Sequence, residues 1–212
     1  MNTRLVCSAF LIATAIGTIN AHAQTDVGIT AAALASFQPI DDTYVGEPYL
    51  SEGVGGIGPG FAAGVNVITA SGFVIATEYS TAFYEKEHSG RTVLGGFPLE
   101  HVIATTRLRD SYLSVLLGYA TSGTTRIVLM GGMSARLGLT TINGEDAERF
   151  ESGDDELWPF TGGIDIVRPL ASRAQLLISG RYTYNMRSSR LQQLGIGPHV
   201  IRGGVGVRIR LN

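Results

Sequence analysis

Hydrophobic and polar residues alternate along the last predicted segment of this 212-residue chain, which covers residues 200–211. Its apolar positions are Ile201, Val205, Val207, Ile209 and Leu211, and the positions between them include Arg202, Arg208 and Arg210. Alternation with a period of two residues predicts a β-strand with one apolar face and one polar face. In a soluble protein the apolar face turns inward, whereas in a membrane barrel it faces lipid and the arginines point into the interior.

Turn-forming residues divide the chain after residue 24 into eight alternating segments. The predicted strands cover residues 26–37, 60–68, 73–86, 101–120, 126–137, 158–168, 174–186 and 200–211. The stretches at 38–58, 140–156 and 187–198, and a loop around 88–90, are predicted to be irregular connections. Because no segment has helical periodicity, the sequence predicts an all-β fold.

The connections between these segments alternate in length. Those after the first, third, fifth and seventh segments are long and polar, and those after the second, fourth and sixth are only a few residues long. In an antiparallel meander this alternation places every long loop at one end. Outer-membrane barrels have short periplasmic turns and long external loops. The pattern therefore predicts an eight-stranded antiparallel up-and-down transmembrane β-barrel.

The third segment illustrates how its two faces differ. Phe73, Ile75, Tyr79 and Phe83 share one face, and Ala76, Glu78, Ser80 and Ala82 share the other. The fifth to eighth segments follow the same pattern, and the longer fourth segment is ambiguous. One face of the sheet is thus predicted to be apolar and the other small and polar. Aromatic residues near segment ends, such as Tyr119 and Trp158, match the aromatic girdles of membrane barrels.

The first 23 residues indicate a cleavable export signal. Arg4 supplies a positive charge, residues 5–17 are mainly apolar, and Ala21-His22-Ala23 matches the small-residue pattern of signal peptidase sites. The apolar stretch is short for a membrane-spanning helix, which needs about 20 residues. We therefore expect a signal peptide over residues 1–23 and a barrel domain over 24–212, with a retained N-terminal anchor as the alternative.

Composition adds two constraints on the exported chain. Cys7 is the only cysteine and lies within the signal, so we expect neither disulfides nor a cysteine-rich metal site. The formal net charge of −2 gives no reason to expect a nucleic-acid partner. Lys86 is the single lysine, so the cations are almost all arginines, which suit buried ion pairs because the planar guanidinium binds carboxylates in a two-pronged manner.

The run from Arg107 to Tyr119, RLRDSYLSVLLGY, is similar to mid-barrel strands of one membrane-protein class. With the eight-segment pattern, the chain resembles the small outer-membrane β-barrels of Gram-negative bacteria, the OmpA-like or OmpX-type transmembrane domains. The resemblance implies outer-membrane localisation, contact with lipid and lipopolysaccharide, assembly by the barrel insertion machinery, and a structural or surface-interaction role through four external loops. It does not identify the loop partner. One departure is Leu211-Asn212, because the final strand of this family commonly ends in an aromatic residue.

An eight-stranded barrel has an interior just wide enough for side chains to fill. We expect an ion-pair network there, formed by Glu78, Asp110, Asp165, Arg136, Arg181, Arg202 and Arg208, with Arg107 as a further candidate. Such a network would plug the lumen. The alternative is a gated or selective pore for small solutes.

Two other functional classes are alternatives. An outer-membrane lipid-modifying enzyme would need a Ser–His–acid set near the long loops. Three histidines fall in or beside those loops: His88, His101 and His199. A possible set combines His101 with Glu100 and either Ser89 or Ser111. Neither spacing nor motif requires this set, so we predict no catalytic residue and a protein that is not an enzyme.

The second class is a soluble lipocalin-like barrel that binds an apolar ligand, with its apolar face inside and its arginines outside. The Gly-x-Trp signature of lipocalins is missing. The acidic run at 145–156 could hold calcium, because carboxylates are calcium ligands. That run lacks the spacing of an EF-hand loop and is predicted to be solvated. We predict no cofactor and no metal site.

Overall fold

The computed structural model describes residues 25–45, 55–94, 97–142, 145–150, 158–185 and 194–211. The predicted signal peptide, residues 1–23, lies outside these ranges. The strands are β1 (Asp26–Gln38), β2 (Ile40–Val45), β3 (Gly56–Ile68), β4 (Phe73–Leu94), β5 (Phe97–Ala120), β6 (Arg126–Ile142), β7 (Glu145–Phe150), β8 (Phe160–Pro169), β9 (Ala174–Tyr184), β10 (Leu194–Ile196) and β11 (His199–Arg210). Over these ranges, the structure contains no helix long and apolar enough to cross a membrane.

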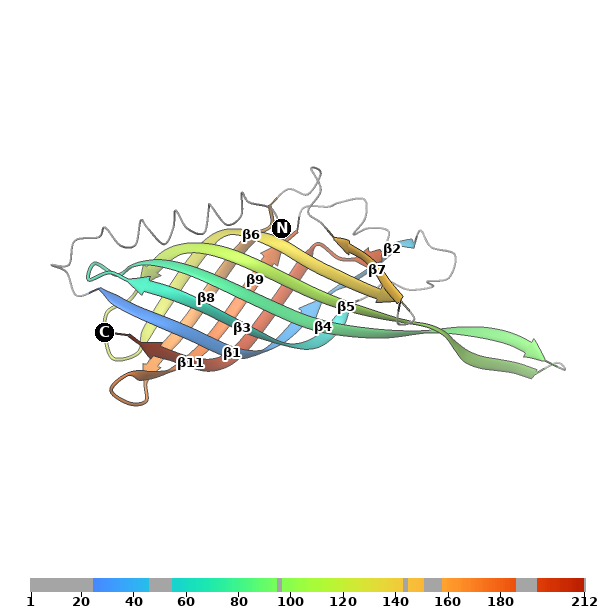
Figure 1. The fold of residues 1–212 in the computed structure, drawn as a ribbon, viewed down its shortest axis with the longest axis horizontal. Helices are drawn as coiled ribbons and strands as arrows, with labels where there is room; N and C mark the ends of the chain where they lie inside the picture. Colours follow the sequence, from blue (N-terminus) through green and yellow to red (C-terminus); the bar gives the residue numbers. More distant parts are fainter. Residues whose placement is uncertain are drawn as a thin grey trace.

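Eight of these strands form a closed antiparallel barrel (Figure 1). Their order is β5-β4-β3-β1-β11-β9-β8-β6, and pairing between β5 and β6 closes the sheet. The first and last strands are neighbours, because β1 pairs with β11 from Gly28 opposite Arg210 to Phe37 opposite Ile201. Every other neighbouring pair joins consecutive barrel strands. The predicted eight-stranded up-and-down architecture is confirmed.

Three short turns lie at one end of the barrel, which we call the turn end. They connect β3 to β4, β5 to β6 and β8 to β9. In the first, the amide of Gly72 donates to the carbonyl of Thr69 at 2.9 Å. Gly72 has a φ of 89°, a left-handed conformation that glycine adopts without the steric cost that a Cβ would add. The long connections all leave from the opposite end, the loop end, as the sequence predicted.

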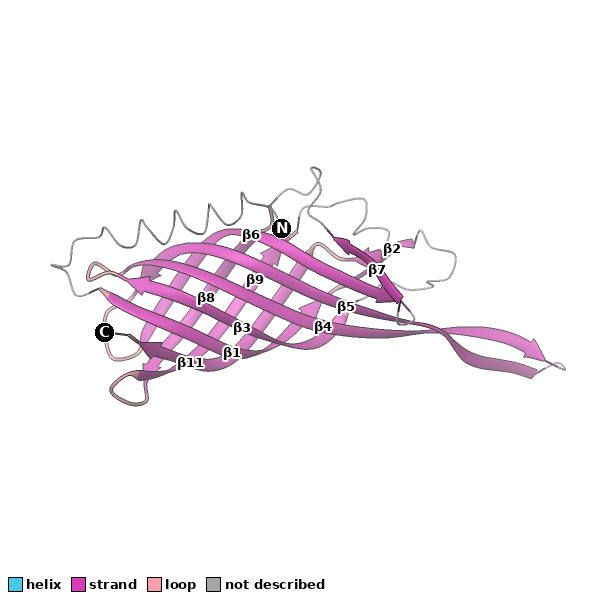
Figure 2. Cartoon of the chain, in the orientation of Figure 1, coloured by secondary structure: helices cyan, strands magenta, loops and turns pink. Residues whose placement is uncertain are grey.

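The β4–β5 hairpin differs from the prediction. The loop expected around residues 88–90 is part of β4, and the two strands stay paired up to Leu94 opposite Phe97. The hairpin thus extends well beyond the barrel as a two-stranded ribbon (Figure 2). Backbone hydrogen bonds alone can pair two strands, so a ribbon of this kind does not require the alternation of apolar and polar residues by which a strand is recognised in a sequence.

Three shorter strands also lie in stretches that were predicted to be irregular. β2 falls within 38–58 and β10 within 187–198, and these two strands pair with each other. β7 falls within the acidic stretch 140–156 and pairs with the end of β6. All three lie at the loop end (Figure 1). Like the ribbon, these strands pair through backbone hydrogen bonds outside the barrel, and such pairing does not require a periodic pattern of apolar residues.

The polarity of the barrel is inverted relative to a soluble protein. Large apolar residues on the outer surface are strongly exposed, among them Leu117, Leu129 and Val205 at 51%, 60% and 59%. In contrast, Arg208 and Ser134 inside the barrel are completely buried. This matches the predicted faces and is the reverse of the lipocalin-like arrangement, which is therefore wrong.

The interior is less uniformly polar than the sequence suggested. It also contains an apolar cluster, whose members include Ile68, Val74, Leu116, Ala120, Val128, Met130, Val167 and Leu177. Several of these residues flank the three short turns, so apolar side chains occupy part of the turn-end interior.

Candidate functional site

Arg181 is the centre of the first ion-pair group in the lumen. From β9, its Nη1 donates to Asp165 Oδ1 at 2.5 Å and its Nη2 donates to Glu78 Oε2 at 2.7 Å. Asp165 lies on the neighbouring strand β8, but Glu78 lies on β4 in the opposite wall. The two-pronged contact with Asp165 is the geometry in which guanidinium–carboxylate pairs are strongest. The group thus ties opposite walls together across the interior.

Glycine at position 163 provides the space that Arg181 occupies. A Cβ built at Gly163 would lie 2.7 Å from Arg181 Cδ and 2.9 Å from its Nη1. Real Cβ atoms do not approach other atoms so closely, so a larger residue would displace a side chain that is held by two carboxylates. The small residue on β8 is therefore part of the ion-pair group.

Arg136 and Asp110 form a second buried pair between the neighbouring strands β6 and β5. Arg136 Nε donates to Asp110 Oδ1 at 2.8 Å, and both residues are buried. The guanidinium carbon of Arg136 also lies 5.7 Å from the centroid of the Tyr112 ring. The structure therefore brings together five of the predicted lumen residues in two groups.

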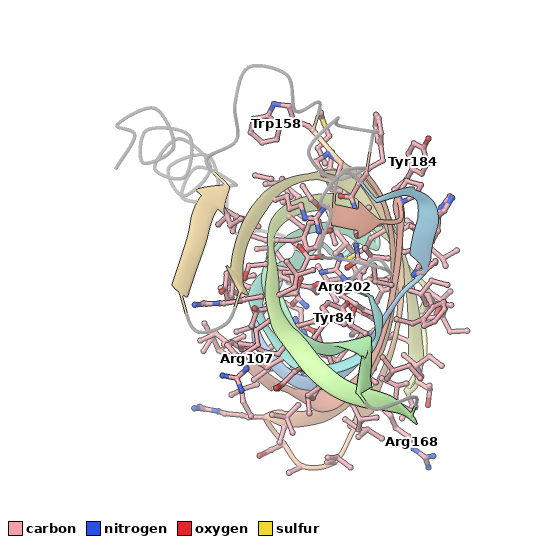
Figure 3. The ribbon with its side chains drawn as sticks, turned by 90° about the vertical axis from the view of Figure 1, so that its right-hand side faces the viewer. Tyr84, Arg107, Trp158, Arg168, Tyr184 and Arg202 are labelled. Carbon is pink, nitrogen blue, oxygen red and sulfur yellow. The ribbon has the colours of Figure 1, made fainter. Side chains whose placement is uncertain are left out.

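Arg202 lies in the lumen but contacts no carboxylate among the described residues. Its guanidinium donates to the hydroxyl groups of Ser80 and Thr183, and its central carbon lies 4.4 Å from the centroid of the Tyr112 ring. An aromatic face attracts a cation through its quadrupole, which offsets part of the cost of burial. Figure 3 shows Arg202 and Tyr84 pointing into the barrel.

A row of hydroxyl groups crosses four strands beside Arg202. Ser114 contacts Ser134 at 2.8 Å, Ser134 contacts Thr161 at 2.6 Å, and Thr161 contacts Thr183 at 2.9 Å. Thr183 then accepts from Arg202. Sequence analysis missed this row, although all four residues occupy polar positions of alternating segments. It joins the side chains of the interior into a continuous hydrogen-bonded layer.

Arg208 pairs with Asp26, which was not among the predicted lumen residues. Its Nη2 lies 2.9 Å from Asp26 Oδ1, and its other nitrogens donate to Asn66 Oδ1 at 2.8 Å and Gln175 Oε1 at 2.6 Å. The carboxylate of Asp26 also contacts Arg126 at 3.0 Å and Arg210 at 3.3 Å. Asp26, Arg126, Arg208 and Arg210 make up what we call the turn-end cluster.

Arg107 does not belong to the lumen, and its inclusion as a candidate is wrong. Its side chain is on the outer surface, where Nη2 contacts Glu85 Oε1 at 3.1 Å and both side chains are more than half exposed. Arg107 and Asp110 are three positions apart on one strand. Alternation places such residues on opposite faces, so the burial of Asp110 requires Arg107 to face outward.

The candidate Ser–His–acid set is partly tested. His101 and Ser111 lie ten positions apart on β5, which is about 33 Å along a strand, so a set that includes both is wrong. The side chains of Ser89, Glu100 and His101 lie outside the described residues, as does that of His88. His199 is exposed, and its Nδ1 lies 2.7 Å from the hydroxyl of Tyr182.

No group of three or more His, Cys, Asp or Glu residues that could hold a metal ion is present in the described part of the chain. The side chains at 145–150 and all residues at 151–157 fall outside that part. The calcium hypothesis for the acidic run is therefore not addressed by this geometry.

No protein-family model matches the sequence, and no curated protein matches it. Solved structures similar to this chain include Neisserial surface protein A, with a TM-score of 0.52, 11% identity, and coverage of 87% of this chain and 97% of that one. Ail, the attachment invasion locus protein of Yersinia pestis, has a TM-score of 0.52, 10% identity and coverage of 88% and 98%. A major outer membrane protein from Thermus thermophilus has a TM-score of 0.57, 10% identity and coverage of 89% and 100%. At these identities the likeness shows the fold alone.

Proposed function

We propose that this chain is an integral outer-membrane β-barrel protein of a Gram-negative bacterium, with a lumen plugged by its own side chains and a structural or surface-interaction role at the loop end. The observation that carries the proposal is a closed barrel with its large apolar side chains on the outside. In water such a surface would be strongly unfavourable, because exposed apolar area carries a free-energy cost of about 25 cal/mol per Å². In lipid the same surface is favourable.

The size of the apolar surface supports this proposal. On β6, outward-facing apolar residues extend from Ile127 to Leu137, which are ten positions apart and 42% and 43% exposed. Ten positions correspond to about 33 Å along a strand, and a strand tilt of about 40° reduces this to a height of about 25 Å. That height equals the apolar band of outer-membrane barrels.

Exposed aromatic residues border this band at both ends. Phe73 and Tyr119 lie beside the turns, and Trp158, Phe160 and Tyr184 lie toward the loop end. Figure 3 shows Trp158 and Tyr184 on the outside of the barrel. Aromatic side chains prefer the interface between hydrocarbon and water, so their placement supports a membrane position for this band. The short turns favour a periplasmic location of the turn end.

The buried lumen residues support a plug rather than a pore. Arg181, Asp165, Asp110 and Arg202 are each at most 6% exposed. The Arg181–Glu78 pair connects walls that face each other, and the other ion pairs and the hydroxyl row link neighbouring strands, so opening a channel would require several buried charges to separate. In this role Glu78, Asp110, Asp165, Arg136, Arg181, Arg202 and Arg208 are structural residues.

Fractionation and electrophoresis test the membrane part of the proposal. We expect the protein to sediment with outer membranes, to require detergent for purification, and to migrate faster on gels before boiling than after. Purification as a soluble monomer without detergent would refute it. Lipopolysaccharide contact and assembly by the insertion machinery are expected from an outer-membrane location.

Planar-bilayer recording tests the plug. The inserted protein is expected to give no steady ion-selective conductance. Regular single-channel steps from the wild-type protein would overturn the plug while leaving the membrane location intact.

A further inference from the structure

The charged residues of the turn end are unevenly distributed. Among the described residues of the three short turns and the four strand positions next to the turn end on every barrel strand, there are five arginines and one carboxylate. The arginines are Arg126, Arg168, Arg173, Arg208 and Arg210, and the carboxylate is Asp26. Five positive charges minus one negative charge leave a local surplus of four.

The surplus is on one side of the barrel. Arg126 begins β6, Arg168 is near the end of β8, Arg173 precedes β9, and Arg210 ends β11. These four strands are consecutive in the barrel order. The other two short turns, at 69–72 and 121–125, contain no charged residue. We call Arg126, Arg168, Arg173 and Arg210 the turn-end arginine patch.

Asp26 cannot neutralise this patch, because three guanidinium groups already share its carboxylate. One of them, Arg208, is fully buried, whereas the side chains of Arg126 and Arg210 are 31% and 37% exposed. The side chains of Arg168 and Arg173 are exposed and have no ion-pair or hydrogen-bond partner among the described residues. The patch therefore presents unpaired guanidinium groups at its surface.

The same region also exposes apolar side chains. Arg168 follows Ile164 and Ile166 on the outer face of β8, and Figure 3 shows it pointing away from the barrel. Leu170 in the adjoining turn is 62% exposed, and Leu211 after β11 is 53% exposed. Basic residues combined with exposed apolar residues at the edge of a lipid-facing surface suit anionic headgroups, since the leucines enter the acyl region and the arginines bind phosphate.

We propose that the turn-end arginine patch binds the phosphate groups of anionic phospholipids in the leaflet that surrounds the turn end. This inference rests on the proposed membrane function and adds a lipid class to it. Arg168 and Arg173 supply unpaired guanidinium groups at the barrel edge, and Arg126 and Arg210 add positive charge at the rim. Because these arginines lie on one side of the barrel, the patch binds anionic headgroups on that side only.

The test uses the exported protein reconstituted in nanodiscs that contain equal amounts of phosphatidylglycerol and phosphatidylcholine. Native mass spectrometry of the detergent-released protein measures which lipid stays bound. The wild-type protein is expected to retain phosphatidylglycerol preferentially, and added NaCl is expected to reduce the preference. One surface arginine contributes about fivefold to anionic-lipid affinity, so R168Q/R173Q is expected to lower the preference about 25-fold.

R107Q is the matched control, because Arg107 is an exposed arginine at the opposite end of the barrel. It is expected to retain the wild-type preference. The proposal is overturned if inserted wild-type protein shows no preference, if salt does not weaken it, or if R107Q and R168Q/R173Q lose it equally. If the double variant does not fold, the salt titration of the wild-type protein still tests the proposal, because a lipid preference that salt does not weaken would overturn it.

A second arm measures co-sedimentation with isolated sacculi, which carry carboxylates. Binding to sacculi that depends on Arg168 and Arg173, without any lipid preference, would overturn the lipid assignment in favour of the cell wall. Failure of the wild-type protein to enter any bilayer would refute the membrane function itself, and the lipid inference with it. Normal insertion without lipid selectivity would refute the lipid inference alone.

Discussion

Replacement of Arg181 by methionine tests whether the lumen ion pairs hold the barrel together. Methionine retains an unbranched side chain but removes the guanidinium that contacts Asp165 at 2.5 Å and Glu78 at 2.7 Å. Both carboxylates then remain in an interior where Asp165 is 4% exposed, without the cation that compensates them. Removing one partner of a buried pair typically costs about 3–5 kcal/mol. Since two carboxylates lose their partner, we expect R181M to lie at the upper end, near 5 kcal/mol.

The assay is equilibrium unfolding in urea, with the barrel in lipid vesicles, followed by the fluorescence of Trp158, the only tryptophan, and by the gel mobility of unboiled samples. R181M is expected to shift the midpoint strongly to lower urea. The triple variant R181M/E78Q/D165N is expected to recover much of the loss, because it removes the uncompensated charges as well. E78Q alone leaves the Asp165 pair in place and is expected to cost about 1–3 kcal/mol. An R181M barrel within 1 kcal/mol of wild type would refute the reasoning.

Two further substitution pairs test the packing and the membrane surface. Gly163→Ala is expected to lower the free energy of unfolding by about 1–3 kcal/mol, because the added Cβ would lie 2.7 Å from Arg181 Cδ. Gly162→Ala is the control, because no atom lies within 4 Å of its added Cβ. Equal urea midpoints for the two variants would contradict the close contact. Met133→Arg places a charge near the middle of the apolar band and is expected to cost about 2–4 kcal/mol in vesicles, whereas Ile127→Arg at the band edge is expected to cost about 0–1 kcal/mol. Equal costs for these arginines would contradict the proposed membrane position.

The barrel itself could be predicted because its strands alternate strictly between lipid-facing and interior residues. Along β11, Ile201, Val205 and Val207 are exposed while Arg202 and Arg208 are buried, as the alternation requires. The short turns were also predictable, because they interrupt this period. The β4–β5 ribbon could not be predicted in the same way, because its pairing depends on the partner backbone and does not require an apolar period.

The choice of partners in the lumen was only partly predictable. Alternation places Glu78 and Arg181 inside, but which carboxylate meets which guanidinium depends on the stagger between strands, which no single segment encodes. For this reason Arg202 was expected to meet a carboxylate and instead contacts hydroxyl groups and the Tyr112 ring. The position of Asp26 in the lumen could have been predicted, because Asp26 lies an even number of residues from the buried positions of its strand.

The contacts of Asp26 have a consequence for the order of assembly. Asp26 begins the first barrel strand, and its partners Arg208 and Arg210 end the last one. The seam between these strands is therefore stabilised by charged residues that are far apart in the sequence and can meet only after β11 has been synthesised. A chain that stops before β11 would leave β1 and β9 as two open edges, each able to recruit strands from other molecules. Only a chain that includes β11 pairs both edges, so a chain interrupted before β11 is expected to aggregate and not to form a smaller barrel.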